Sequence, residues 1–192
     1  MNATNTIIGA CVAIFVVELI MPGIINVFAF SASTVFYEPW TIVTSMFLHS
    51  GITHLLFNMF ALFMFGGTLE RKVGTKYFLG LYLVSGILGA IGFGLTSPNG
   101  AAVGASGAIY GVIGALALLE PHMTIFLMGI PMPMYVGGIV YALIELVGMG
   151  GTNSFGSKDN IAHSAHLVGL LGGLGAALVW KSRNTQKYEW EK

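Results

Sequence analysis

A small set of polar side chains interrupts stretches of sequence that are otherwise apolar. The set comprises His49, His54, Asn58, Ser106, Glu145, His163 and His166. Ser106 and His166 could support nucleophilic acyl transfer, with the hydroxyl as nucleophile and the imidazole as general base. Such a reaction turns an amide carbonyl into an oxyanion. The side chains of His54 and Asn58, with the backbone N–H of Ser106, are the donors available to that charge.

The same histidines could instead ligate a metal ion or a haem. His163-x-x-His166, together with His49 and His54, offers imidazole nitrogens of the kind that hold zinc or haem iron. The chain contains no HExxH pattern, and carboxylate or cysteine ligands near these histidines are scarce. We therefore expect no metal site and no cofactor.

The composition is that of a membrane protein. Of the 192 residues, 55% are hydrophobic and 8% are charged, whereas roughly a quarter of the residues in soluble domains are charged. The eight basic and eight acidic residues cancel, so there is no net basic field to bind nucleic acid. Cys11 is the single cysteine, which excludes an internal disulfide. The predicted fold class is an all-α integral membrane protein.

Six apolar stretches, nearly free of charge, approach the roughly 20 residues that cross a bilayer as a helix. They predict transmembrane helices at residues 6–20, 52–69, 77–96, 105–119, 134–149 and 161–180. A cleavable signal at the first stretch is disfavoured, because no Lys or Arg precedes it. The segment 21–50 is rich in aromatic residues, which predicts a loop that lies in the membrane interface between the first two helices.

Basic residues predict the orientation in the membrane. Most of them fall on one side of the predicted helices: Arg71, Lys72, Lys76, Lys181, Arg183, Lys187 and Lys192. Lys158 lies on the other side. The positive-inside rule then places both termini in the cytoplasm and the loops 21–50, 97–104 and 150–160 outside the cell membrane. The last loop is polar and glycine-rich, so it could act as a lid or be an ordinary linker.

Helix geometry brings the candidate side chains to one depth near the outer face. His54 and Asn58 share one face of the second helix, and Ser106 and Tyr110 share one face of the fourth. Taken singly, a serine in such a helix usually bonds a backbone carbonyl, and a histidine is usually a satisfied interior residue. Polar groups are costly at this depth, so their joint occurrence favours a functional site.

Small residues would let the fourth and sixth helices approach closely. The sixth helix carries Gly169 and Gly173 near the face of His166. The fourth helix carries an adjacent stripe of three glycines: Gly107, Gly111 and Gly114. Such stripes allow helix backbones to pack against each other in a membrane. A direct hydrogen bond between Ser106 and His166 would require that approach.

Four short motifs follow one another along residues 40–180. They are MFLH at 46–49 with HLLFNM at 54–59, GGTLERKVG at 66–74, GASG at 104–107, and AHLVG at 165–169 with Gly173. In this order they resemble the motifs of the rhomboid intramembrane serine proteases, in the family's minimal six-helix form. One departure is visible, because Trp40 is followed by Thr41 where many relatives carry arginine.

The resemblance implies a single protease domain over residues 1–192 that cleaves transmembrane helices of other proteins near the outer face. It implies a Ser106–His166 dyad without a third carboxylate, and an oxyanion site at His54 and Asn58. It also implies that Tyr110 packs against the catalytic imidazole.

Other motif residues would support the site. The resemblance implies that Glu70 ties the cytoplasmic end of the second helix to neighbouring segments and that His163 is not the base. Gly104, His49 and Gly169 stand at motif positions beside the proposed catalytic and oxyanion residues.

Glu145 lies near the depth of the dyad by the helix count. It could be a third member of a triad, but a buried ionised carboxylate needs a specific partner, and the family pattern supplies none in this role. We expect Glu145 to be a packing or gate residue, neutral or hydrogen-bonded toward the loop 150–160.

Two further functions are compatible with six membrane helices. One is a rhomboid-like protein that binds membrane proteins without cleaving them, which the intact serine and histidine disfavour. The other is a six-span carrier, for which internal repeats with broken helices in matching positions are expected and are not visible. The sequence specifies neither the physiological substrate nor the oligomeric state.

Overall fold

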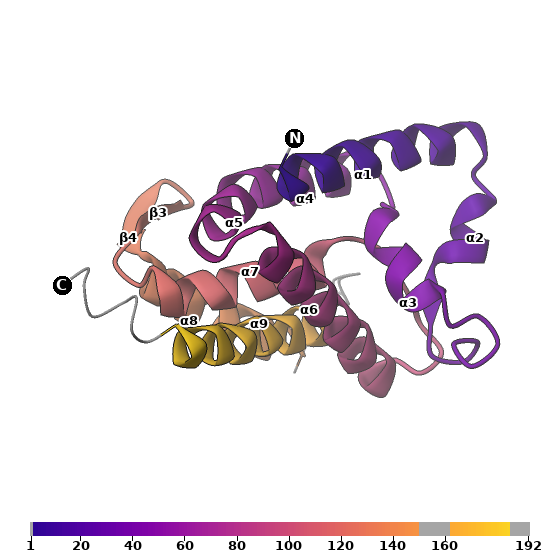
Figure 1. The fold of residues 1–192 in the computed structure, drawn as a ribbon. Coiled ribbons are helices and arrows are strands. Elements are labelled where there is room, and N and C mark those ends of the chain that lie inside the picture. The colour runs from indigo at the N-terminus through magenta and orange to yellow at the C-terminus, as the bar shows by residue number, and fades with distance from the viewer. Residues whose placement is uncertain (1, 150–161, 185–192) are drawn as a thin grey trace.

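The computed structural model describes residues 2–149 and 162–184, and this part of the chain is mostly helical (Figure 1). Its longest helical stretches are α1 (Ala3–Ile20), the continuous run of α4 (Ile52–Ala61), a π-helical turn η2 (Leu62–Gly66) and α5 (Gly67–Val73), then α6 (Thr75–Thr96), α7 (Ser106–Leu119), α8 (Met134–Met149) and α9 (His163–Arg183). The first residue of each stretch lies within three residues of the first residue of a predicted helix. The positions of the uncharged apolar stretches therefore predicted where these helices begin to within a few residues.

Among the described helices, four are long and apolar enough to cross a membrane. They are α1, the run Ile52–Val73, α6 and α9. The chain is thus a multi-pass membrane protein. Helices α7 and α8 are apolar but shorter, with 14 and 16 residues. A helix of 14 residues rises about 21 Å, less than the hydrocarbon core of a bilayer.

Helix α7 is enclosed by its neighbours. Ten of its 14 residues are buried, and its most extensive contacts are with α9 and α6 (Figure 1). The glycine stripes account for this packing. A Cβ atom on Gly173 would overlap the backbone carbonyl of Gly111, and one on Gly169 would overlap that of Gly107. The close approach of these two helices that the stripes predict is present.

Two short sheets were not predicted from the sequence. Strand β1 (Phe30–Ser31) pairs antiparallel with β2 (Ala101–Ala102). Strands β3 (Thr124–Leu127) and β4 (Ile130–Pro133) form a hairpin. Its two-residue turn has positive φ at both Met128 (51°) and Gly129 (82°), as a turn between tightly twisted strands requires. The hairpin joins α7 to α8.

The segment 21–50 folds into short pieces, which include α2 (Ile24–Phe28), α3 (Thr41–Thr44) and the 3₁₀ turn η1 (Ser45–Phe47). The indole of Trp40 donates to the carbonyl of Val27 at 3.4 Å. The buried Thr41 donates its hydroxyl to the carbonyl of Glu38 at 2.6 Å. Local hydrogen bonds therefore hold this segment together.

Glu70 joins the start of α1 and the start of α6 to α5. One carboxylate oxygen accepts from the backbone N–H of Ala3 and the hydroxyl of Thr75, both at 2.8 Å. The other accepts from the backbone N–H of Thr4 at 2.9 Å and from its hydroxyl at 2.7 Å. A carboxylate at the N-terminus of α1 satisfies N–H groups that have no partner within the helix.

We expect Glu70→Ala to lower the free energy of unfolding by about 2–3 kcal/mol, because buried donors to a charged group lose their acceptor. The melting temperature in detergent, followed by intrinsic fluorescence, measures this loss. Glu38→Ala removes a partly exposed carboxylate and is the matched control, for which little change is expected. Equal melting temperatures for the wild type and Glu70→Ala would contradict the role of Glu70 as a tie.

Candidate active site

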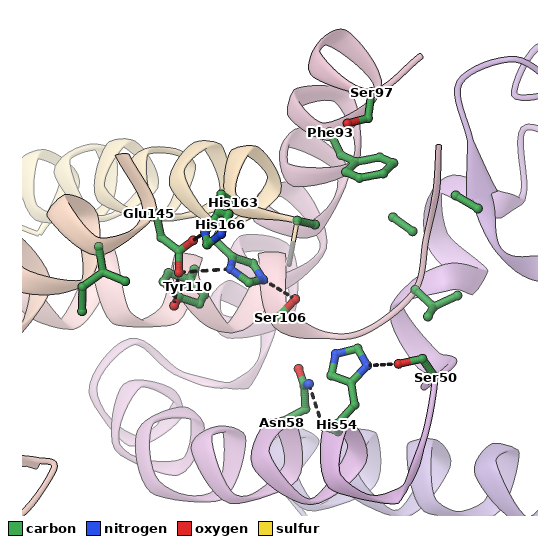
Figure 2. Close-up of a pocket in the computed structure, with 15 residues that line it drawn as sticks. Ser50, His54, Asn58, Phe93, Ser97, Ser106, Tyr110, Glu145, His163 and His166 are labelled. Carbon is green, nitrogen blue, oxygen red and sulfur yellow. Dashed lines mark hydrogen bonds and ion pairs between the residues drawn. The ribbon is translucent and has the colours of Figure 1, made fainter. Parts of the chain in front are cut away.

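A cavity of about 870 Å³ lies at the end of the helix bundle where α4, α7 and α9 begin and where α6 and α8 end (Figure 2). Six of the polar residues that line it come from α4, α7, α8 and α9: His54, Asn58, Ser106, Glu145, His163 and His166. The cavity therefore gathers on one surface the polar side chains that the sequence placed at one depth, apart from His49.

The hydroxyl of Ser106 and the imidazole of His166 are in direct contact. The distance from Ser106 Oγ to His166 Nε2 is 2.8 Å. Ser106 is the first residue of α7, and His166 lies in the first turn of α9. The Gly107–Gly169 backbone contact lies close by along the same two helices and fixes their separation. In this geometry a proton can pass from the serine hydroxyl to the imidazole.

Tyr110 supports the imidazole from α7. Its ring stacks on that of His166, with ring centroids 4.4 Å apart and planes inclined by 4°. Tyr110 follows Ser106 by one helical turn, so the nucleophile and the stacking ring share a face. This arrangement holds the orientation of the His166 ring.

Glu145 enters the cavity from α8 (Figure 2). Its Oε1 accepts a hydrogen bond from the hydroxyl of Tyr110 and lies 3.2 Å from His166 Nδ1. Its Oε2 lies 2.6 Å from His163 Nδ1. These partners are on α7 and α9, whereas we expected contacts toward the loop 150–160, which lies outside the described residues. The question whether that loop is a lid or an ordinary linker also falls on residues outside the described part of the chain.

On the opposite wall of the cavity, α4 presents His54 and Asn58 (Figure 2). The ring nitrogen Nδ1 of His54 is 3.1 Å from the hydroxyl oxygen of Ser50. The side-chain amide of Asn58 donates to the backbone carbonyl of His54 at 2.9 Å. Since an amide NH₂ has two donors, one N–H of Asn58 is left for another acceptor.

Gly104 lies directly against the His54 ring. A Cβ atom on Gly104 would come within 2.7 Å of His54 Cε1, and φ at this position is 121°. Its backbone N–H donates to the carbonyl of Ser45 at 2.9 Å. Both the tight contact and the positive φ require glycine here. The glycine of the GASG motif thus seats the segment that leads into Ser106 against α4.

His49 lies behind His54 and is 1% exposed. The ring centroids of the two histidines are 5.2 Å apart. Burial and the neighbouring His54 lower the pKa of His49 to about 4, so its imidazole is neutral at neutral pH. Its backbone N–H donates to the carboxylate of Glu18 on α1 at 3.1 Å.

The four histidines of the alternative metal site fall into two pairs. His49 and His54 pack on each other, and His163 and His166 both contact Glu145. Within residues 2–149 and 162–184, no group of three His, Cys, Asp or Glu side chains is arranged to hold a metal ion.

The contact between His163 and Glu145 was not predicted from the sequence. It depends on how α8 is rotated about its own axis, which the apolar sequence of that helix does not specify.

Comparison with known proteins gives consistent matches. The Rhomboid domain model matches residues 37–183. The chain is 37% identical to YdcA of Bacillus subtilis over 152 residues, which cover 79% of this chain and 72% of YdcA. It is 39% identical to Rhomboid protease GluP of the same organism over 142 residues, 73% of this chain but 26% of GluP.

Rhomboid protease GlpG of Yersinia pestis is a further relative, 29% identical over 192 residues, which cover 96% of this chain and 64% of GlpG. The chain thus spans most of YdcA and smaller parts of the two proteases. The domain match covers well over half of the chain and contains the whole cavity described above. The chain belongs to the rhomboid family.

Proposed function

We propose that the chain is an intramembrane serine endopeptidase that cleaves peptide bonds in or near the transmembrane helices of other membrane proteins. The observation that carries this proposal is the 2.8 Å contact between Ser106 Oγ and His166 Nε2 inside a cavity bounded by apolar helices. The rhomboid proteases among its relatives support a protease activity within the membrane.

In the proposed reaction, Ser106 Oγ attacks the carbonyl carbon of the peptide bond while His166 Nε2 takes the hydroxyl proton. The electron pair of the carbonyl moves to its oxygen. That oxyanion would accept hydrogen bonds from His54, from the second N–H of Asn58 and from the backbone N–H of Ser106 at the start of α7. The amine leaves with the proton from His166, and water then releases the acyl-enzyme.

The same proposal includes a topology. Six membrane helices form one rhomboid domain over residues 1–192, with both termini in the cytoplasm, the segment 21–50 in the interface and the cavity toward the outer face. Cleavage near that face would let a substrate helix unwind into a polar cavity, where its backbone groups find protein or water. Transmembrane proteins and the lipid bilayer are the proposed partners.

Incubation of the purified protein in detergent with a model single-span substrate, beside Ser106→Ala, tests the proposal. We expect specific cleavage by the wild type and labelling of Ser106 by a fluorophosphonate probe. A protein that binds the substrate without cleaving it would favour a non-catalytic membrane-protein binder. If neither binding nor cleavage occurred, the six-span carrier would be the better interpretation.

We expect His54→Ala and Asn58→Ala to lower kcat by about 10²–10³, with a smaller change in KM, because oxyanion donors bind the transition state more strongly than the substrate. Steady-state kinetics on the same model substrate measures both constants. Ser97→Ala, which changes another polar residue of the cavity wall, is the control and should keep the wild-type kcat. A raised KM with an unchanged kcat would assign either residue to substrate binding instead.

A further inference from the structure

We propose that Glu145 is a positioning residue for His166. Its buried carboxylate orients the imidazole and favours the proton on Nδ1, so that Nε2 is free to act as the base for Ser106. This inference rests on the proposed protease function. It departs from the dyad without a third carboxylate that the family resemblance implies. It starts from the position of the carboxylate, which lies on the side of the imidazole away from Ser106 (Figure 2).

The two nitrogens of His166 face two different groups. Nε2 contacts Ser106 Oγ at 2.8 Å, and Nδ1 lies 3.2 Å from Glu145 Oε1. A carboxylate accepts but does not donate, so the proton of a neutral imidazole is favoured on Nδ1. Nε2 then keeps its lone pair toward the serine. This is the tautomer that a general base for Ser106 requires.

The carboxylate itself is held by donors from two helices. Glu145 is 2% exposed, and a buried carboxylate is tolerated only when it is paired and hydrogen-bonded. The hydroxyl of Tyr110 donates to Oε1, and His163 Nδ1 contacts Oε2 at 2.6 Å. The His163 ring is wedged against α8, since a Cβ atom on Gly148 would overlap it. The buried carboxylate of Glu145 therefore has the specific partners that it needs, although the sequence alone did not identify them.

Tyr110 links the carboxylate to the base. Its ring stacks on His166 while its hydroxyl donates to Glu145. One residue of α7 thus fixes the plane of the imidazole and the position of the carboxylate that faces it. A packing role for Glu145 would need only its contacts with Tyr110 and His163. The approach to His166 Nδ1 is the contact that points to the reaction.

In the proposed reaction, Glu145 assists the first proton transfer, from Ser106 to His166. When Ser106 Oγ bonds to the carbonyl carbon, its proton moves to Nε2 and the imidazole becomes a cation that carries protons on both nitrogens. Glu145 stays ionised and stabilises that cation through Nδ1–H. When the amine leaves, it takes the proton from Nε2, and the imidazole returns to the neutral Nδ1–H form. Glu145 neither gains nor loses a proton in this cycle.

We expect Glu145→Gln to lower kcat by a factor on the order of 10²–10⁴, with KM nearly unchanged, because the isosteric amide removes the negative charge and keeps the volume. The rate of phosphonylation of Ser106 by a small fluorophosphonate should fall in parallel. That probe does not occupy a helix-binding site, so its rate reports on the serine and the base. End-point labelling counts the active sites and corrects for any unfolded fraction.

Glu18→Gln is the matched control. Glu18 is another buried glutamate, located on α1, and its described partner is the backbone N–H of His49. A glutamine oxygen can still accept that bond, so kcat and the labelling rate should equal those of the wild type.

Should Glu145→Gln fail to fold, Tyr110→Phe provides the second variant. It keeps the stacking ring and removes only the donor to Glu145, and we expect kcat to fall about tenfold at constant KM. His163→Ala should retain measurable cleavage, since His163 acts on the carboxylate and not on the reacting atoms.

The outcomes separate this inference from the proposed function. A Glu145→Gln protein with wild-type kcat and labelling rate, beside an inactive Ser106→Ala, overturns the role of Glu145 and leaves the protease intact. A higher KM alone would also overturn it, because it would place Glu145 in substrate binding. Full cleavage by Ser106→Ala would instead overturn the proposed function.

Discussion

Ser106→Ala and His166→Ala should each lower kcat by a factor on the order of 10⁶ while the protein stays folded. The two side chains act as a unit across the 2.8 Å contact, so that loss of either stops proton transfer and nucleophilic attack together. Cleavage of a model single-span substrate in detergent, followed by gel analysis, measures the effect. Melting temperatures of the variants show whether they are folded.

A histidine and a serine outside the cavity wall and outside the dyad serve as controls for this pair. His122 follows α7, and Ser182 lies near the end of α9. We expect His122→Ala and Ser182→Ala to retain the wild-type kcat. Substantial cleavage by folded Ser106→Ala would require another nucleophile, and substantial cleavage by folded His166→Ala would require another base.

Gly173→Ala should destabilise the protein by about 3 kcal/mol and should also abolish cleavage. The added Cβ atom would overlap the backbone carbonyl of Gly111, and neither atom belongs to a side chain that could rotate away. The helices α7 and α9 must therefore separate. Ser106 and His166 lie on these same two helices, so their hydrogen bond would lengthen. The melting temperature and kcat in detergent measure the two effects.

Gly175→Ala is the matched control for this variant. Within the described part of the chain, no atom outside its own helix lies within 4 Å of a Cβ placed on Gly175. Alanine also favours a helix over glycine by roughly 1 kcal/mol. We expect Gly175→Ala to be as stable as the wild type or slightly more stable, with full activity. If Gly173→Ala and Gly175→Ala had the same melting temperature, the close packing of α7 on α9 would not limit stability.

Part of the candidate site could be predicted from the depth of the polar residues within the apolar stretches and from helical periodicity. A residue count from the start of each apolar stretch puts Ser106 and His166 near one level, and the glycine stripes predict that α7 and α9 touch. The structure places the two side chains in contact, and helix packing against Gly107 and Gly169 accounts for it. Whether these residues catalyse cleavage is a prediction that the variants above test.

The remaining features depend on information that local sequence does not carry. Helix α8 is apolar around most of its circumference, so its sequence does not specify which side faces α9, and the contacts of Glu145 could not be predicted. The β1–β2 pair joins residues about 70 positions apart in the sequence, with Phe30 opposite Ala102. The β3–β4 hairpin contains Pro131 and Pro133, which reduce the strand signal because proline cannot donate to a ladder.

The enclosure of α7 separates the candidate site from changes in bilayer thickness. Lipids of different acyl-chain length act on the helices that they touch, by tilting them or by drawing their ends toward the headgroups. Helices such as α1, with Leu19 and Ile20 exposed at its end, would feel this hydrophobic mismatch. Helix α7, buried along most of its length, would be shielded from it. Membrane thickness should therefore govern how a substrate helix reaches the cavity, while the spacing of Ser106 and His166 stays constant.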